Sequence, residues 1–192
     1  ACVSDEDCVS ALCGEPHHVG DVVITHPADL AALQGIEHLD GALIIENTSG
    51  LKSLDGLESL TCVGGLSIRY NEDLETLKGL DSLSIIKGNL SIIGAKTVTT
   101  TDEEDEETIT RHTGHAALET LDALGELRFV VGDVEIAANP ALEDLTGLQN
   151  LVAIGGSFTL GSTNTLAYTL QPVRDDIFIP GNSGLVSLHG LE

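Results

Sequence analysis

The clearest group of chemically active side chains is an acidic segment from Asp102 to Glu107, followed by two histidines. Carboxylates are the oxygen ligands that Ca²⁺ prefers, and imidazoles are ligands for transition metals. The segment lacks the glycine turn and spaced ligands of an EF-hand loop, so a solvated loop is the alternative interpretation. Ca²⁺ is the only cofactor that the sequence suggests. The metal ligands would be Asp102, Glu103, Asp105, Glu106, His112 and His115.

The cysteines form a second group, and three of the four lie within the first thirteen residues. An even number with this clustering predicts two disulfides and an oxidising compartment. A zinc site is the alternative, but the Cys-x-x-Cys spacing typical of zinc sites is absent. Four cysteines allow three pairings, and the sequence does not choose among them. The residues concerned are Cys2, Cys8, Cys13 and Cys62.

The remaining residues show no pattern typical of catalysis. No Ser-His-Asp arrangement, phosphate loop or metal motif recurs at a strand end, and no carboxylate has the apolar sequence context that would raise its pKa. The sequence therefore predicts a protein that is not an enzyme.

The charge and hydropathy of the chain limit its partners. Its net charge is -23, from 8 basic and 31 acidic residues, which disfavours nucleic acid and anionic membranes. No run of about 18 apolar residues is present, so we expect no membrane span. The 192 residues suit one domain, and with 42% hydrophobic but only 3% aromatic residues its core must be aliphatic.

Internal repetition is the strongest signal in the chain. Each repeat has two halves, and the first is a glycine followed by apolar residues at alternating positions, which predicts a short strand. These strand segments are Gly20–Ile24, Gly41–Ile45, Gly64–Ile68, Gly88–Ile92, Gly132–Ile136, Gly156–Leu160 and Asp175–Ile179.

The second half of each repeat has leucine at every third position. This spacing does not fit an α-helix, whose apolar stripe advances by 3.6 residues, so we expect flat coil or 3₁₀ turns and a second narrow sheet. Asn71, Asn139 and Asn182 recur before these segments, where they would bond backbone groups of stacked turns or simply favour a turn. The regular segments are 30–39, 51–60, 74–83, 118–127, 142–151 and 185–191.

The two periods together predict a mainly β fold, a right-handed single-stranded solenoid with short parallel strands and few helices. Residues 1–18 would form a Cys-rich N-terminal cap, and residues 19–192 the solenoid with an acidic insertion at 94–117. The chain stops inside a coil, so we expect it to continue, to be capped, or to self-associate through the edge near Ile177–Ile179.

Strand alternation also predicts which side chains face outward. Val23 and Ile44 begin this outward column as an apolar patch, which is either a contact site or a surface covered by the N-terminal cap. The column consists of Val23, Ile44, Ser67, Ser91, Glu135, Thr159 and Phe178.

The segment from Gly20 to Ile45, with Leu30, Leu33 and Gly35 at its centre, resembles the receptor L-domain branch of leucine-rich repeat proteins. That family includes the L domains of growth-factor receptors, fungal cell-wall proteins and bacterial secreted proteins. The resemblance implies a secreted or surface-anchored binding role without catalysis. Ile36 stands where such domains often carry a cysteine, so the resemblance supplies no disulfide pairing.

Three functions follow from these patterns. The first is an extracellular recognition or adhesion module that binds protein or glycan through one face of the solenoid. The second is a structural subunit stacked end to end in a fibre or surface layer, and the third is a Ca²⁺-responsive adhesin that uses the acidic insertion.

Overall fold

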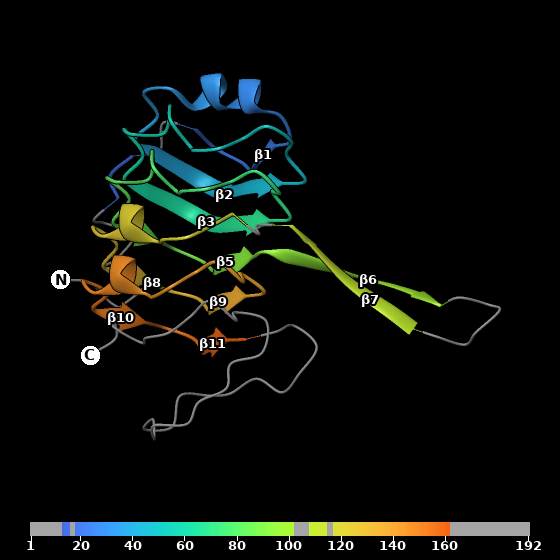
Figure 1. Cartoon of the computed structure of the whole chain (residues 1–192). Coiled ribbons are helices and arrows are strands. Elements are labelled where there is room, and N and C mark those ends of the chain that lie inside the picture. The colour runs from blue at the N-terminus through green and yellow to red at the C-terminus, as the bar shows by residue number, and fades with distance from the viewer. Residues whose placement is uncertain (1–12, 16–17, 102–107, 115–116, 162–192) are drawn as a thin grey trace.

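The computed structural model describes residues 13–15, 18–101, 108–114 and 117–161, with the backbone alone for 95–101 and 108–114. The chain winds into a solenoid of about five turns, in which strands of successive coils pair in parallel (Figure 1). The predicted fold class, a mainly β solenoid of short parallel strands, is confirmed.

The described elements are strands and 3₁₀ helices of three to seven residues. In chain order they are β1 (Val22–Ile24), η1 (Pro27–Leu33), β2 (His38–Glu46), β3 (Cys62–Arg69), β4 (Ile85–Ile86), β5 (Leu90–Ile93), β6 (Ala95–Thr101), β7 (Thr108–Gly114), η2 (Asp122–Leu124), β8 (Phe129–Val130), β9 (Val134–Ala137), η3 (Thr146–Leu148), β10 (Ala153–Ile154) and β11 (Phe158–Leu160).

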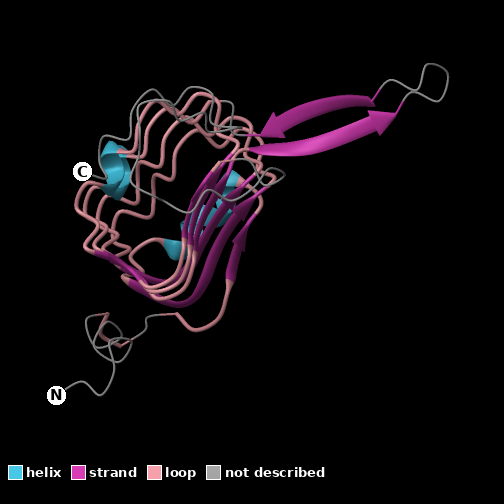
Figure 2. Cartoon of the chain, turned by 90° about the horizontal axis from the view of Figure 1, so that it is seen from below, coloured by secondary structure: helices cyan, strands magenta, loops and turns pink. Residues whose placement is uncertain are grey.

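The strands form two ladders along the solenoid. The first ladder contains the starts of β2 and β3, followed by β4, β8 and β10. The second ladder contains β1, the ends of β2 and β3, and then β5, β9 and β11. Strands β2 and β3 belong to both, and Figure 2 shows the sheet bending around one side of the solenoid. Both ladders belong to one sheet of nine strands, so the described leucine segments form no separate second narrow sheet.

The leucine segments close each coil with turns of three residues. The amide of Leu57 donates to the carbonyl of Leu54, at 3.2 Å, and the amide of Leu60 donates to Leu57, at 2.9 Å. A turn of three residues brings every third side chain to the same side, so the period of three fills the core. Leu54, Leu57 and Leu60 are buried, as are their equivalents in the other described coils except Ile36 and Leu151, which are partly buried.

At two of the glycines that precede the third apolar residue of these segments, Gly79 and Gly147, adjacent coils touch. Gly79 has a φ of 110°, and a Cβ at this position would overlap the backbone carbonyl of Leu54 in the preceding coil. The same contact joins Gly147 to the carbonyl of Leu121. Close stacking of the coils thus requires glycine at these positions.

Two buried asparagines join the end of the second ladder to its neighbouring coils. The side-chain oxygen of Asn71 accepts the amide and hydroxyl of Thr48, at 3.0 and 2.8 Å, and its nitrogen donates to the carbonyl of Ile45. Asn139 donates to the carbonyls of Ile92 and Ala137. The predicted asparagine bonding between stacked turns is confirmed at both positions, and Asn182 lies outside the described residues.

The insertion at 94–117 contains an antiparallel hairpin. Strands β6 and β7 pair from Ala95 with Gly114 to Thr101 with Thr108, and the hairpin projects from the solenoid (Figure 1, Figure 2). A solvated loop or a metal site was the prediction for this segment, and paired strands were not predicted. Its β-branched threonines favour strands and are the sequence feature that indicates the hairpin.

Candidate functional site

The outward residues of the second ladder lie in one continuous row. Val23 pairs in register with Ile44, Ile44 with Ser67, and Ser67 with Ser91. The row continues through Glu135 to Thr159. Six of the seven predicted binding-face residues are therefore neighbours on one sheet face, and Phe178 lies outside the described residues.

An open groove of about 620 Å³ runs along this face. Its floor is low because the side chains near its middle are small: Ala42, Gly65, Ser67 and Ser91. Val23 and Ile44 give one end an apolar surface. The lining also includes Glu46, Arg69, Asn89, Asp133 and Glu135.

Among the described residues that line the groove, Arg69 is the only basic one, and three are acidic. Its Nη2 donates to the hydroxyl of Ser91, at 3.3 Å, whereas its Nε is buried and makes no hydrogen bond. None of the ion pairs formed by the described residues includes Arg69. Its guanidinium therefore has donors available to an acceptor in the groove.

Several acidic and amide side chains beside the groove accept hydrogen bonds from backbone amides and are therefore less available to a partner. Asp21 accepts the amide of Ala42, and Asn89 accepts the amide of Asp133, both at 2.8 Å. Asp133 in turn accepts the amide of Ser157, at 2.7 Å. These bonds link successive coils and fix the bend at the edge of the groove, so we assign these three side chains to support.

Val23 is 50% exposed, and the described part of the N-terminal cap bonds to the first ladder. The rest of the cap lies outside the described residues, so the cover over Val23 stays a prediction. The alternative interpretation of Val23 and Ile44, a contact surface, stays a prediction.

The cap is fixed to the first ladder by a disulfide between Cys13 and Cys62, whose Cα atoms lie 5.6 Å apart. Of the three possible ways to pair four cysteines, only one contains this bond. That pairing would join Cys2 to Cys8, and both of these residues lie outside the described residues. The bond fits an oxidising compartment.

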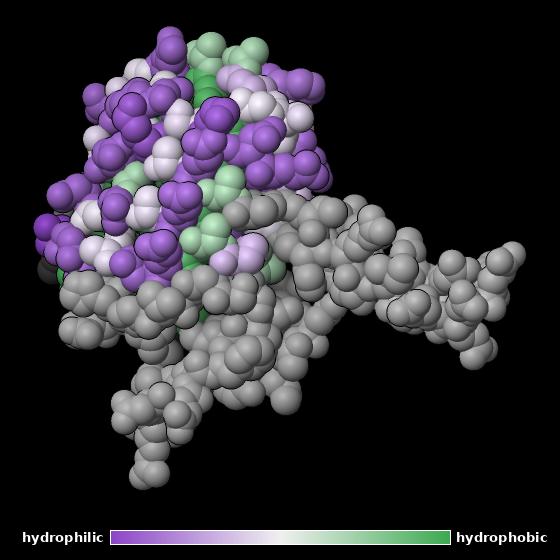
Figure 3. Space-filling view, in the orientation of Figure 1, coloured by the Kyte–Doolittle hydropathy of each residue, from purple (hydrophilic) through white to green (hydrophobic). Residues whose placement is uncertain are grey.

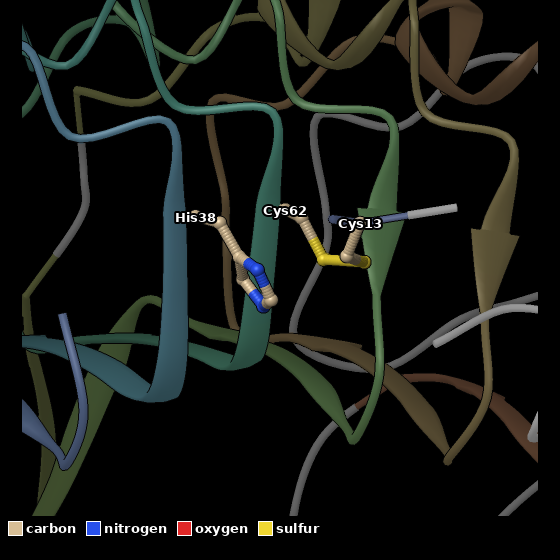
Figure 4. A group of neighbouring side chains, drawn as sticks. All are labelled: Cys13, His38 and Cys62. Atoms are coloured by element: carbon tan, nitrogen blue, oxygen red, sulfur yellow. A yellow bond between two sulfur atoms is a disulfide. The ribbon is translucent and has the colours of Figure 1, made fainter. Parts of the chain in front are cut away.

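His38 lies beside this disulfide and was missed by the sequence analysis (Figure 4). It pairs in register with Cys62, and its Nδ1 lies 3.1 Å from the carbonyl oxygen of Gly14. Aligning His38-Leu39 with Cys62-Val63 one coil later would have found it. Nearby, the ammonium of Lys87 bonds the carboxylate of Asp40 and holds the pKa of that carboxyl below its usual range.

The predicted metal site cannot be placed from the described residues. Asp102, Glu103, Asp105, Glu106 and His115 lie outside them, as does the strand edge near Ile177. His112 lies in β7, where its backbone pairs with Thr97. Calcium binding and end-to-end stacking stay predictions.

The remaining described surface is largely hydrophilic in the view of Figure 3, as the net charge of -23 requires. The described residues contain no helix long and apolar enough to cross a membrane. The chain matches no family model, no curated protein and no solved structure, so the groove and the Cys13–His38–Cys62 cluster stand on their geometry alone.

Proposed function

We propose that this chain is a non-enzymatic recognition module, secreted or held at a cell surface, that binds a protein partner through the groove on its second ladder. The observation that carries the proposal is the continuous row from Val23 to Thr159, hollowed at its centre by small side chains. A rigid parallel sheet holds such a row in place before binding, which reduces the entropy lost on association.

The chemistry of the groove favours one kind of partner. Its apolar end at Val23 and Ile44 suits an aliphatic or aromatic anchor, and Glu46 and Glu135 attract a cationic group. Arg69 offers donors to a carbonyl or carboxylate of the same partner. A protein segment with apolar and basic side chains meets all three requirements.

A glycan is the weaker alternative. Aromatic side chains contribute a large share of contact area at recognition surfaces, and the described residues that line the groove include none. Its hydroxyl and amide groups at Ser67, Ser91 and Asn89 are few, and Asn89 is engaged with the backbone. We therefore place protein before glycan.

A non-enzymatic role agrees with the state of the acidic groups. Asp133 is engaged with the backbone amide of Ser157, and Glu46 and Glu135 face an open sheet surface. An open surface gives a carboxylate little of the desolvation that prepares a general acid or base. The groove therefore suits binding better than proton transfer.

The proposal is tested by screening the purified chain against arrays of secreted proteins and of glycans. The discriminating variant is Ser67→Arg, which fills the groove floor. Its control is Ser59→Arg, which adds the same charge at an exposed serine of a leucine segment. We expect a protein partner whose affinity falls at least about tenfold with Ser67→Arg and is unchanged with Ser59→Arg.

Equal affinity of both variants for every partner found would place the binding surface elsewhere. Partners found only among glycans would overturn the choice of protein, and turnover of a substrate by the purified chain would overturn the non-enzymatic role.

A further inference from the structure

Three potential metal ligands meet where the N-terminal cap joins the first ladder. Cys62 begins β3, His38 begins β2 in register with it, and Cys13 lies on the N-terminal segment that bonds to Cys62 by the disulfide and contacts His38 through Gly14 (Figure 4). One ligand atom from each of the three residues lies within 4.8 Å of the others. Two of these ligands are joined as a disulfide, so the group is closed to metal in the oxidised chain.

The imidazole of His38 is held as a metal ligand usually is. A carbonyl oxygen only accepts hydrogen bonds, so the contact with Gly14 requires that Nδ1 carry the proton. In the neutral ring Nε2 then has a free lone pair. Ligating histidines typically donate their other ring N–H to a backbone carbonyl in this way.

The Nε2 atom of His38 is buried and unsatisfied. The side chain is 4% exposed, its Nε2 makes no hydrogen bond, and the closest carboxylate oxygen, from Asp40, lies 3.9 Å away. Burying an unpaired polar atom costs free energy. The next residues of the same row, Ile85 and Phe129, are apolar, so packing does not require histidine here.

We propose that reduction of the Cys13–Cys62 disulfide converts this cluster into a zinc site formed by both thiolates and the imidazole of His38. A dithiol reductant supplies two electrons and two protons, and is itself oxidised to a disulfide. Zn²⁺ then displaces the two thiol protons and binds both sulfurs and one imidazole nitrogen. Water fills the fourth position.

The geometry requires only small movements. Zinc–sulfur bonds of about 2.3 Å and zinc–nitrogen bonds of about 2.0 Å place tetrahedral ligand atoms about 3.3–3.8 Å apart. One ring nitrogen of His38 and the two sulfurs already lie within 4.8 Å of one another, and the two sulfurs separate once their bond is broken. The cap is thus joined to β3 by a disulfide when oxidised and by zinc when reduced.

The test uses a Cys2→Ser/Cys8→Ser background, which keeps the cluster and removes the other thiols. This protein is reduced with a dithiol, freed of reductant without oxygen, and titrated with Co²⁺ as a spectroscopic probe for Zn²⁺. We expect one Co²⁺ per chain, thiolate-to-cobalt absorption, and loss of that absorption when Zn²⁺ is added. The oxidised protein should show none of these.

The role of His38 is tested by His38→Ala and His38→Asn, each expected to weaken Co²⁺ binding at least about tenfold. His26→Ala is the control, because His26 is exposed and lies outside the cluster. Circular dichroism must show that each reduced variant keeps its β structure, and the urea-unfolded chain must bind at least about tenfold more weakly.

Absence of thiolate-to-cobalt absorption in the reduced background would overturn the proposal. Unchanged affinity in both His38 variants would overturn the role of the imidazole, and equal binding by the unfolded chain would show that the fold forms no site.

Discussion

The two strand ladders are built from the same repeat, but their outer faces differ. On the first ladder, outward residues His38, Cys62 and Ile85 are buried near the cap, which is bonded there through Cys13. Farther along the same row Phe129 is partly buried and Ala153 is exposed. On the second ladder the part of the row from Val23 to Glu135 borders an open groove. The repeat thus places apolar side chains on the inner face of both ladders. Whether the outer face of a ladder is covered is decided by segments that lie outside the repeat.

The comparison also separates two ways of stabilising a sheet. The first ladder is held partly from outside, by a covalent bond to the cap. The second is held from inside and at its end, by its aliphatic core and by buried asparagines such as Asn71. The loss in the free energy of unfolding caused by a substitution should therefore depend on which ladder contains the substituted residue.

The largest effect is expected from removing the bond between cap and first ladder. Cys13→Ala/Cys62→Ala opens a disulfide between residues 49 positions apart, which by loop entropy lowers the free energy of unfolding by about 4 kcal/mol. Urea denaturation of the oxidised proteins measures the difference. A loss below about 1 kcal/mol would show that the cap contributes little to the first ladder.

The second largest effect is expected at the inner support of the second ladder. Asn71→Ala removes the bonds to Thr48 and Ile45 and leaves their buried backbone groups unpaired, at a cost of about 2–4 kcal/mol. Thermal and urea unfolding measure it. Asn89→Ala, which removes an exposed bond to Asp133, is the control and should cost less than about 1 kcal/mol. Similar costs for both would contradict an inner support.

The same substitution on each outer face compares the ladders directly. Ile85→Thr places a hydroxyl at a buried position of the first ladder and should cost about 1–2 kcal/mol. Ile44→Thr lies on the partly exposed groove face and should change stability by less than about 0.5 kcal/mol. Equal values in urea unfolding would mean that both faces are covered to the same extent.

The smallest effect is expected from the surface pair of Asp40 and Lys87 beside the first ladder. The folded pKa of Asp40 is lowered, chiefly by its hydrogen bond to Lys87. Its contribution is therefore present above the ordinary carboxyl value of 3.8 and is lost as the pH falls through the lowered folded value.

Asp40→Asn should accordingly make unfolding slightly less sensitive to pH between about 5 and about 2. Urea midpoints across that range measure it, with Asp21→Asn as the control, because Asp21 has no lysine partner among the described ion pairs. If the urea midpoints at low pH are the same for Asp40→Asn and the unsubstituted protein, the pair of Asp40 and Lys87 does not contribute to stability.

The sequence predicted the solenoid and the outward row from local spacing alone. Alternation gives each strand its inner and outer residues, and the period of three marks turns that bring Leu54, Leu57 and Leu60 together. Six of the row residues followed because the strands pair glycine to glycine along the chain. That this row borders a groove depended on small residues of neighbouring strands, such as Ser67 and Ser91, lying side by side, which only the strand pairing shows.

The hairpin of β6 and β7 and the position of His38 were not predicted. The acidic residues of the insertion indicated metal ligands, and the strand-forming residues on either side of them indicate the hairpin. His38 pairs with Cys62 in the first ladder, whose strands are short, and this pairing was not predicted because that ladder was not recognised from the sequence.

The sequence by itself determined the coil, because in a solenoid each residue meets its equivalent one repeat away, and the spacing within a repeat is sufficient to fill the core. Only the tertiary structure decided which outer face is covered, which cysteine bonds Cys62, and that an unsatisfied imidazole lies beside that bond. These depend on contacts between segments outside the repeat, and alternation treats both outer faces alike.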